Sequence, residues 1–393
     1  MPNENLSEAK RKKNDEFYTQ YSDIEKEMNA YLDYDPNVFR GKTILLPCDD
    51  PEWSNFTKYF AQNFDRFGLK KLVSTSYAVE SKTYKSNYQP TLFEKNDPQY
   101  DEIKTSSNGK IFTLSSDRTG DQRVNVDDLE WHYLKGDGDF RSDEVKRLRD
   151  EADIIITNPP FSMFREFLAW IMDAQKQFLI IGNLNAITYK EVFPLLKANK
   201  VWLGNNYKVN GGAMFYEIPE DIANLEQVRE IRTNELGKRV YITRVQGVRW
   251  FTNLDHGRLH QPLPLMTMAD NLKYSKHKEI KCKQSYLRYD NYDAIEVPYV
   301  DAIPSDYEGA MGVPISFLDK YNPHQFEILG TNDNGLVDIK YKLTPGLTKE
   351  FVSDYYKAGG TGSYKEGNPT AGYYENNIAK MAYKRVFIQH RRG

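Results

Sequence analysis

Short apolar runs of strand length alternate with segments of helical spacing through the first two thirds of the chain. The apolar runs occupy residues 41–46, 71–77, 153–157, 177–182, 201–203 and 248–252. The helical segments occupy residues 14–32, 55–64, 143–151 and 162–175, and Ser54 is the expected N-cap of the second of them. Strands that alternate with helices pair in parallel through right-handed crossovers. The pattern therefore predicts an α/β fold with a doubly wound, mostly parallel sheet.

The alternation of strands and helices ends near residue 255. Beyond this point the chain is rich in Tyr, Pro and charged residues and loses the regular spacing of the first part. We therefore expect two domains, an α/β domain at residues 1–255 and a C-terminal region of mixed α+β structure at 256–393. Residues 81–110 are polar and turn-rich, which predicts an insertion or a hairpin within the first domain.

The strand at 153–157 ends at Asn158-Pro159-Pro160-Phe161, which places Asn158 where open α/β sheets bind ligands. The side-chain oxygen of Asn158 and the carbonyl of Pro159 could accept hydrogen bonds from an exocyclic amine such as N6 of adenine. That would localise a lone pair otherwise delocalised into the ring. Phe161 could stack on a base swung out of a duplex. The corner predicts amine methylation, although a strand that simply ends in a proline turn has the same sequence.

Composition narrows the class of protein. The chain has 393 residues, two cysteines far apart in sequence, and a polar, charged N-terminus unlike a signal peptide. No apolar run approaches membrane-spanning length, and no repeat of solenoid spacing occurs. We therefore expect a cytoplasmic protein that has no disulfide and does not associate with membranes. No His, Cys or Asp cluster has the spacing of metal ligands, so we expect no metal.

Charge is unevenly distributed although the net charge is only −3. Residues 229–288 contain 13 Lys and Arg against 5 Asp and Glu, residues 289–340 contain 2 against 10, and residues 341–393 contain 9 against 4. A basic segment after an acidic first part is typical of a protein that holds a polyanion with one lobe. Solvated faces of ordinary helices would give the same counts. The candidate contacts to nucleic acid in the basic segment are Arg244, Arg249, Arg258, Lys273, Lys276 and Lys278.

Several motifs give the chain a family resemblance over nearly its whole length. They occupy residues 15–19, 48–51, 136–140, 158–161, 250–254, 289–293 and 312–314. With these motifs in this order the chain resembles the EcoRI-type adenine-specific DNA methyltransferases, with the γ-like arrangement of cofactor elements first and recognition region last. The resemblance implies a class I methyltransferase fold of the Rossmann-like kind with S-adenosylmethionine as cofactor. Residues 1–255 would bind the cofactor and catalyse, and residues 256–393 would recognise the target.

The resemblance also implies a reaction and partners. The substrate would be double-stranded DNA, with methyl transfer to N6 of adenine by base flipping, as in a restriction–modification or a phage or bacterial modification system. A cognate restriction endonuclease would be a separate chain.

The resemblance further implies which residues bind the cofactor. The set is Phe17, Tyr18, Thr19, Pro47, Cys48, Asp49, Asp50, Ser54, Thr75, Ser76, Tyr77, Asp139 and Phe140. Thr19, on the N-terminal helix, would bind the methionine end, and Asp49 and Asp50 would pair with its amino group. Asp139 would accept from the adenine amino group of the cofactor, and Phe140 would pack on that ring.

Two features depart from the wider methyltransferase pattern. The corner Pro47-Cys48-Asp49-Asp50-Pro51 has no glycine, although glycines commonly let backbone approach the ligand there. The ribose-contact position at 75–77 lacks the usual acidic residue, which Glu80 could replace.

Other functions are compatible with parts of the sequence. The Asn-Pro-Pro-aromatic corner also serves methyltransferases of RNA adenine or of a protein glutamine, but these lack a C-terminal region of this length. Asp270 with Glu279 and Lys281 weakly imitates a metal-nuclease spacing, which in a Lys-rich stretch is typical of a solvated face. A DNA-binding protein with a catalytically dead methyltransferase fold is a further alternative, which the intact corner disfavours. The strand at 250–254 would form a lip over a flipped base or belong to the core.

Overall fold

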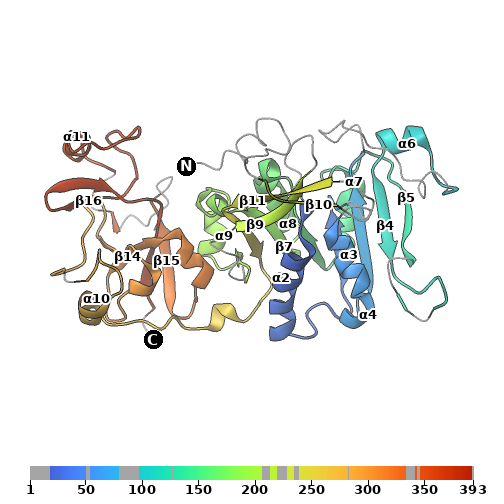
Figure 1. Cartoon of the computed structure of the whole chain (residues 1–393), viewed down its shortest axis with the longest axis horizontal. Coiled ribbons are helices and arrows are strands. Elements are labelled where there is room, and N and C mark those ends of the chain that lie inside the picture. Colours follow the sequence, from blue (N-terminus) through green and yellow to red (C-terminus); the bar gives the residue numbers. More distant parts are fainter. Residues whose placement is uncertain are drawn as a thin grey trace. The chain divides into compact units, whose positions relative to one another are not determined.

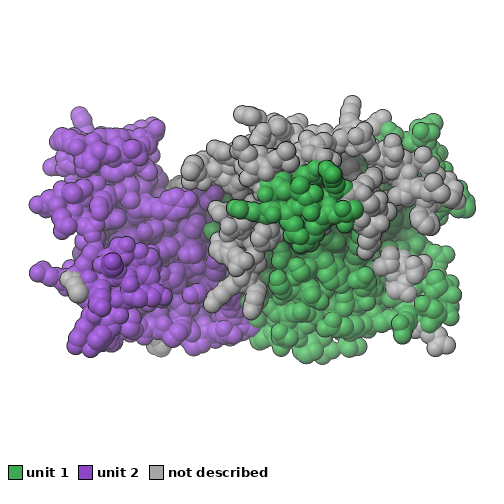
Figure 2. Space-filling model, in the orientation of Figure 1, with its two compact units in different colours: residues 1–184, 203–256 green, residues 185–202, 257–393 purple. Residues whose placement is uncertain are grey.

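The computed structural model describes residues 18–49, 54–78, 97–121, 123–124, 128–205, 213–218, 228–233, 239–281, 283–332, 341–342 and 346–391. The chain forms two compact units, coloured separately in Figure 2. Unit 1 comprises Met1–Leu184 and Leu203–His256, and unit 2 comprises Asn185–Trp202 and Gly257–Gly393. The chain thus passes into unit 2 at 185, returns to unit 1 at 203, and leaves it again at 257.

An eight-stranded sheet forms the centre of unit 1. Its strands are β2 (Thr43–Pro47), β3 (Lys71–Ser76), β4 (Lys110–Leu114), β5 (Glu130–Tyr133), β6 (Ile154–Thr157), β7 (Gln177–Asn183), β8 (Trp202–Leu203) and β12 (Val248–Thr252), in the order β5-β4-β3-β2-β6-β7-β12-β8. The four central strands β3, β2, β6 and β7 are parallel. The flanking strands β4, β5 and β12 pair antiparallel. The sheet is therefore mixed, and the predicted parallel arrangement holds only at its centre.

Helices cover both faces of this sheet (Figure 1). The helices of unit 1 are α2 (Tyr21–Tyr34), α3 (Asn55–Gln62), α4 (Phe64–Phe67), α6 (Glu102–Ser107), α7 (Asp143–Glu151) and α8 (Phe164–Asp173). Ser54 caps α3 as predicted, because its hydroxyl accepts from the Phe56 N–H at 3.1 Å. The predicted strands at the sheet centre and the predicted helix at 143–151 are confirmed.

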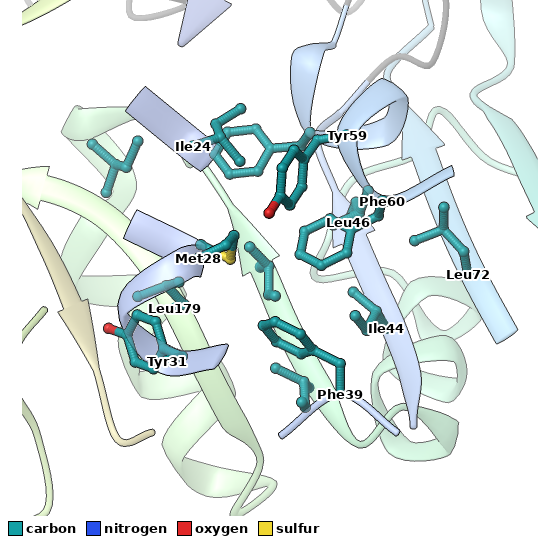
Figure 3. Packing of buried hydrophobic residues seen from close by; sticks show 14 of the residues in the cluster. Ile24, Met28, Tyr31, Phe39, Ile44, Leu46, Tyr59, Phe60, Leu72 and Leu179 are labelled. Carbon is teal, nitrogen blue, oxygen red and sulfur yellow. The ribbon is translucent and has the colours of Figure 1, made fainter. Parts of the chain in front are cut away.

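Alternate strand residues face opposite helices, which explains the apolar runs of the central strands. Side chains of α2 and α3 pack on one face, over Ile44 and Leu46 of β2 and Leu179 of β7 (Figure 3). On the other face Phe164 of α8 packs against Phe251 of β12, with ring centroids 4.9 Å apart. Each central strand is therefore buried on both sides.

The N-terminal segment differs from the prediction of a helix that starts at residue 14. Tyr18–Thr19 form strand β1, and α2 begins only at Tyr21. β1 joins a second sheet with β9 (Ala213–Ile218), β10 (Val228–Thr233) and β11 (Arg239–Gln246), in the order β1-β9-β11-β10. Tyr and Thr fit a pleated strand, and the open edge of β9 supplies hydrogen-bond partners that helical spacing in the sequence cannot reveal. The predicted helix carrying Thr19 is therefore wrong.

Unit 2 is built of short strands and short helices. They include α9 (Phe193–Lys197), α10 (Met268–Tyr274), β13 (Ala294–Glu296), β14 (Ala310–Pro314), β15 (Phe326–Thr331), α11 (Lys349–Lys357), β16 (Gly372–Glu375), β17 (Ile378–Met381) and β18 (Arg385–His390). Four strands form a sheet in the order β13-β14-β18-β15, and β16 pairs with β17. Short 3₁₀ turns complete the chain at η3 (Phe161–Met163), η4 (Leu184–Thr188), η6 (Arg258–His260), η7 (Val300–Ala302) and η8 (Ile315–Lys320). In the part of the chain that the structure describes, no helix is both long and apolar enough to cross a membrane.

Candidate active site

The Asn158 corner lies at the carboxyl end of β6, in the middle of the parallel strands. All four residues of β6 are buried, and both neighbours of this strand are parallel to it. Asn158 is half-buried with its Oδ1 atom enclosed, and Pro159 is buried. The chain then turns through η3 into α8. The structure thus places the Asn158 amide at the edge where open α/β sheets bind ligands.

Phe161 is more enclosed than a stacking platform needs to be. Its side chain is 6% exposed and belongs to the hydrophobic cluster that contains Ile154 and Ile156 of β6. A base could stack on this ring only after neighbouring side chains uncover one of its faces. The stacking role of Phe161 stays a prediction.

A buried carboxylate connects three elements behind the corner. Asp49, just after β2, accepts from the Ser54 hydroxyl at 2.8 Å and lies 2.5 Å from the Thr157 hydroxyl. Thr157 is the last residue of β6 and directly precedes Asn158. Its hydroxyl also donates to the Pro47 carbonyl at 2.6 Å. Asp49 is therefore a junction between the end of β2, the start of α3 and the Asn158 corner, with only 6% of its surface exposed.

Cys48 adopts a backbone conformation that glycine reaches more easily than any other residue. Its φ is +78°, in the left-handed region where non-glycine residues are uncommon. Such a conformation costs on the order of 1–3 kcal/mol and persists where the surrounding structure imposes it. The glycine-free corner thus turns at a cysteine, and the Asp49 N–H that follows donates to the Thr75 carbonyl at 3.0 Å.

Two buried hydroxyls lie beside this turn. The Oγ1 atoms of Thr19 and Thr75 are enclosed and find no hydrogen-bond partner among the described residues. Asn55, the first residue of α3, donates to the Thr19 carbonyl at 2.8 Å, which ties β1 to the same corner. A buried hydroxyl without a partner costs about 1–3 kcal/mol, so both positions suit a polar ligand that supplies the missing hydrogen bond.

The glycine-rich corner at 136–142 packs closely against the end of β3. A Cβ on Gly138 would lie 2.3 Å from the Ser76 carbonyl oxygen, and one on Gly109 would lie 2.5 Å from the same atom. The Ala78 N–H donates to the Asp137 carbonyl at 2.8 Å. The end of β3 is therefore clamped between two glycines, which positions Ser76 and the residues that follow it.

Replacing Gly138 by Ala is expected to destabilise the protein and to weaken cofactor binding. The φ of +89° alone costs about 1–3 kcal/mol for a side chain, and the Cβ must also push the end of β3 away. Gly120→Ala is the matched control, since Gly120 has φ +79° but nothing within 4 Å of its Cβ. Urea unfolding and calorimetric titration with S-adenosylhomocysteine measure both effects. Equal losses of cofactor affinity in the two variants would contradict the positional role of Gly138.

Tyr77, Asp139 and Phe140 meet next to this clamp, but not in the way expected for cofactor contacts. Burial, with the neighbouring Cys48 and Asp139, raises the pKa of Tyr77 far above its usual range. The Arg141 guanidinium, hydrogen-bonded to Asp139 at 2.5 Å and 2.9 Å, lowers the pKa of that carboxyl. Asp139 is thus already engaged by an arginine two residues away.

Phe140 belongs to the core. It is 1% exposed, and its ring packs against Phe167 and Trp170 of α8 with centroid distances of 5.0 Å and 5.6 Å. The expectation that Phe140 packs on the adenine ring of the cofactor is corrected accordingly, because no face of its ring is open. Of the two alternatives given for 250–254, burial favours the core over a lip, since Trp250 and Phe251 are 3% and 0% exposed within β12.

The remaining cofactor candidates divide into two groups. Pro47, Ser54, Thr75 and Ser76 are buried at the carboxyl ends of β2 and β3 or at the start of α3. Phe17 and Asp50 lie outside the described residues, and so does the side chain of Tyr18. The structure therefore brings Thr19, Cys48, Asp49 and Thr75 together near one edge of the sheet, while their contacts with a cofactor stay predictions.

The candidate DNA contacts lie in both units. Arg249 lies in β12 of unit 1, where its Nη1 donates to the Val248 carbonyl at 2.9 Å, and Arg244 lies in β11 with its side chain outside the described atoms. Arg258 begins η6 of unit 2. Lys273, at the end of α10, and Lys278 are exposed, and Lys276 pairs with Asp301 at 2.6 Å. The three lysines therefore share one stretch of the surface of unit 2, but one of them is already neutralised.

Three contributors to the site were not selected from the sequence. Thr157 connects Asp49 to the corner, Gly138 clamps β3, and Arg141 holds Asp139 while contacting Glu166 of α8 at 3.4 Å. A hydroxyl at the last position of an otherwise aliphatic strand was the available signal for Thr157. Among the residues that the structure describes, no three His, Cys, Asp or Glu side chains gather in a way that could hold a metal ion.

Comparison with known proteins adds a family and several relatives. The family described as adenine-specific methyltransferase EcoRI matches residues 5–391. The chain is 42% identical to the type II methyltransferase M.EcoRI of Escherichia coli over 327 residues, covering 83% of this chain and 89% of that protein. It is 32% identical to the type II methyltransferase M.MpnI of Mycoplasma pneumoniae, covering 91% and 95%, and 31% identical to M.MgeORF184P of Mycoplasma genitalium, covering 91% and 96%. No solved structure matches the chain.

Proposed function

The chain belongs to the EcoRI family of adenine-specific methyltransferases, and we propose that it methylates N6 of adenine at a specific site in duplex DNA, as part of a restriction–modification system. The observation that carries the proposal is the Asn158 corner, held at the carboxyl end of the central strand in a family whose members are adenine-specific. We further propose that the mixed sheet of unit 1 is a class I, Rossmann-like methyltransferase fold with helices on both faces.

The residues around the carboxyl ends of β2 and β3 fit a bound S-adenosylmethionine. The enclosed hydroxyls of Thr19 and Thr75 need hydrogen-bond partners, and Gly138 keeps the backbone at the end of β3 close-packed. Thr19, Cys48, Asp49 and Thr75 would hold the cofactor, with Ser76 and Tyr77 beside it. When bound, this cofactor supplies an electrophilic methyl group on a sulfonium, which transfers without a metal.

The Asn158 corner prepares the nucleophile. Its Oδ1 and the Pro159 carbonyl are two acceptors on a rigid turn, and hydrogen bonds to both from an adenine amino group would concentrate the nitrogen lone pair toward the methyl group. The rigidity matters because acceptors that are already oriented cost no reorganisation at the moment of reaction. Pro159 and Pro160 supply that rigidity through their fixed φ angles.

Unit 2 is the proposed target-recognition region. It carries 21 Lys and Arg against 17 Asp and Glu, a formal charge of +4, whereas unit 1 carries −7. The basic segment is less positive than its sequence suggests, because residues of the acidic segment pair with it, as in Lys276–Asp301 and Arg288–Asp293. Lys273 and Lys278 are therefore better candidates for phosphate contacts than Lys276.

Neutralising Lys273 and Lys278 together is expected to weaken binding to all DNA sequences and to flatten its salt dependence. Each lost phosphate contact removes roughly one unit of the slope of log affinity against log salt, so a change of about two units is expected. Adding Lys276→Ala should change the slope little, because Asp301 already balances that charge. Fluorescence anisotropy at several salt concentrations measures the slope.

A matched control is the variant Lys70→Ala/Lys135→Ala, which removes two exposed lysines from unit 1. A slope that stays at the wild-type value when Lys273 and Lys278 are replaced would move the DNA-binding surface elsewhere.

The function is tested by incubating the full-length chain with S-adenosylmethionine and a random-sequence duplex DNA library. Mass spectrometry of the digested DNA should show N6-methyladenine, and modification-sensitive sequencing should show it within one short motif. N4-methylcytosine would overturn the base assignment, and methylation of RNA or of a protein glutamine in place of DNA would overturn the substrate. An active preparation would also exclude a dead methyltransferase fold.

We propose in addition that the protein acts in the cytoplasm and that a cognate endonuclease is a separate chain.

A further inference from the structure

The geometry points to Thr157 as a positioning residue that couples the cofactor corner to Asn158, an inference that rests on the proposed function. Thr157 contacts neither substrate nor cofactor in this scheme. Its hydroxyl lies 2.6 Å from the Pro47 carbonyl and 2.5 Å from the Asp49 carboxylate, 108 residues away in the sequence. It is fully buried and adjoins Asn158 through one peptide bond.

The contact joins two loops that must act together. β2 and β6 are neighbouring parallel strands, but the pairing between them ends at Leu45 and Ile155, before either loop begins. Beyond that point the Thr157 hydroxyl spans the two strand ends and contacts both Pro47 and Asp49. This contact fixes the position of Cys48 and Asp49, which are proposed to hold the cofactor, relative to the Asn158 amide.

Asp49 extends the coupling to the neighbouring elements. Its other carboxylate oxygen accepts from Ser54, the N-cap of α3, and the Ser74 hydroxyl donates to its backbone carbonyl. The Ser74 hydroxyl is in turn 3.0 Å from Thr57 of α3. Asp49 is therefore fixed on the sides of α3 and β3, and Thr157 is its link to β6.

Loss of this link should affect both cofactor binding and chemistry. A methyl donor and an acceptor amine must meet in line, and a displacement of about 1 Å between them can cost on the order of a hundredfold in rate. Thr157→Val keeps the shape of the side chain but removes the hydroxyl. We expect it to lower kcat about 10–100-fold and to weaken S-adenosylhomocysteine binding several-fold, whereas Asn158→Ala should lower kcat alone.

The test compares wild type, Thr157→Val, Thr157→Ser and Thr252→Val by steady-state methylation, calorimetric titration with S-adenosylhomocysteine, and thermal unfolding. Thr252 is the matched control, because it is also a fully buried strand-end threonine, and its hydroxyl donates to the Phe178 carbonyl at 2.7 Å. Thr157→Ser should restore kcat and affinity to near the wild-type values. Thr252→Val should lose stability while keeping both.

Several outcomes would overturn the inference. One is a Thr157→Val enzyme whose kcat and affinity match those of Thr252→Val, and another is a Thr157→Ser enzyme as impaired as Thr157→Val. If Thr157→Val fails to fold, Asp49→Asn replaces it, and unchanged kcat and affinity in that variant would equally reject the coupling. A wild-type chain that methylates no DNA would instead refute the proposed function, so the two failures are distinguishable.

Discussion

Asn158→Ala is expected to abolish methyl transfer while leaving S-adenosylhomocysteine affinity close to that of the wild type. The amide is proposed to accept from the target amine, an interaction that grows as the nitrogen attacks, so its loss should appear in kcat. Removing one oriented polar group from such a site costs about 100–1000-fold in rate. Single-turnover methylation at saturating cofactor and DNA measures the chemical step directly.

Asn253→Ala is a suitable control for Asn158→Ala. Asn253 also follows a strand of the same sheet, but its Oδ1 accepts from the Phe178 N–H at 2.8 Å and so has a structural role. We expect this variant to unfold at lower temperature with its kcat retained. An Asn158→Ala enzyme that turned over normally at saturating cofactor but bound cofactor weakly would show that Asn158 holds the cofactor and does not activate the amine.

Arg385→Ala is expected to destabilise unit 2 by about 3–5 kcal/mol, the cost of leaving one member of a buried ion pair alone. Arg385 of β18 contacts Glu296 of β13 at 2.6 Å, and the two side chains are 11% and 4% exposed. Tyr289 also donates to Glu296, and burial beside this carboxylate raises the pKa of Tyr289 well above its usual value. Without Arg385 the buried Glu296 carboxylate loses its cationic partner and keeps the neutral Tyr289 hydroxyl.

Urea unfolding followed by tryptophan fluorescence and circular dichroism measures the change in the free energy of unfolding. Arg288→Ala is the matched control in the same unit, because its pair with Asp293 has side chains 57% and 53% exposed, and such pairs contribute at most about 1 kcal/mol. The double variant Arg385→Met/Glu296→Leu should recover much of the loss, since a buried pair can be replaced by apolar side chains. Equal effects of Arg385→Ala and Arg288→Ala would contradict this account.

Features that depend on local pattern could be predicted from the amino-acid sequence. The apolar runs at 71–77, 153–157 and 177–182 form buried strands of the sheet. A strand that is covered on both faces needs apolar side chains at consecutive positions, so its sequence is a continuous apolar run. Ser54 capped its helix as expected, because capping needs only the residues that follow within one turn. The Asn158 corner was also readable, since two consecutive prolines must end a strand.

Contacts between residues far apart in the sequence could not be predicted and became visible in the folded chain. Thr19 entered a strand because β9 lay beside it, and Phe140 entered the core because α8 covered it. The charge of the basic segment was reduced by pairing with Asp293 and Asp301, residues that the linear count places in a separate acidic segment. Such pairings depend on topology, and no local periodicity encodes them.

The same distinction separates the two halves of the candidate site. Asn158 could be selected from the residues next to it in the sequence. The role of Thr157 depends on the pairing of β2 with β6, which brings Asp49 within 2.5 Å of its hydroxyl. Secondary structure follows from the spacing of apolar side chains, which the chain carries locally. The alignment of a cofactor loop with a catalytic corner follows from how strands are ordered in the sheet, which only the folded chain decides.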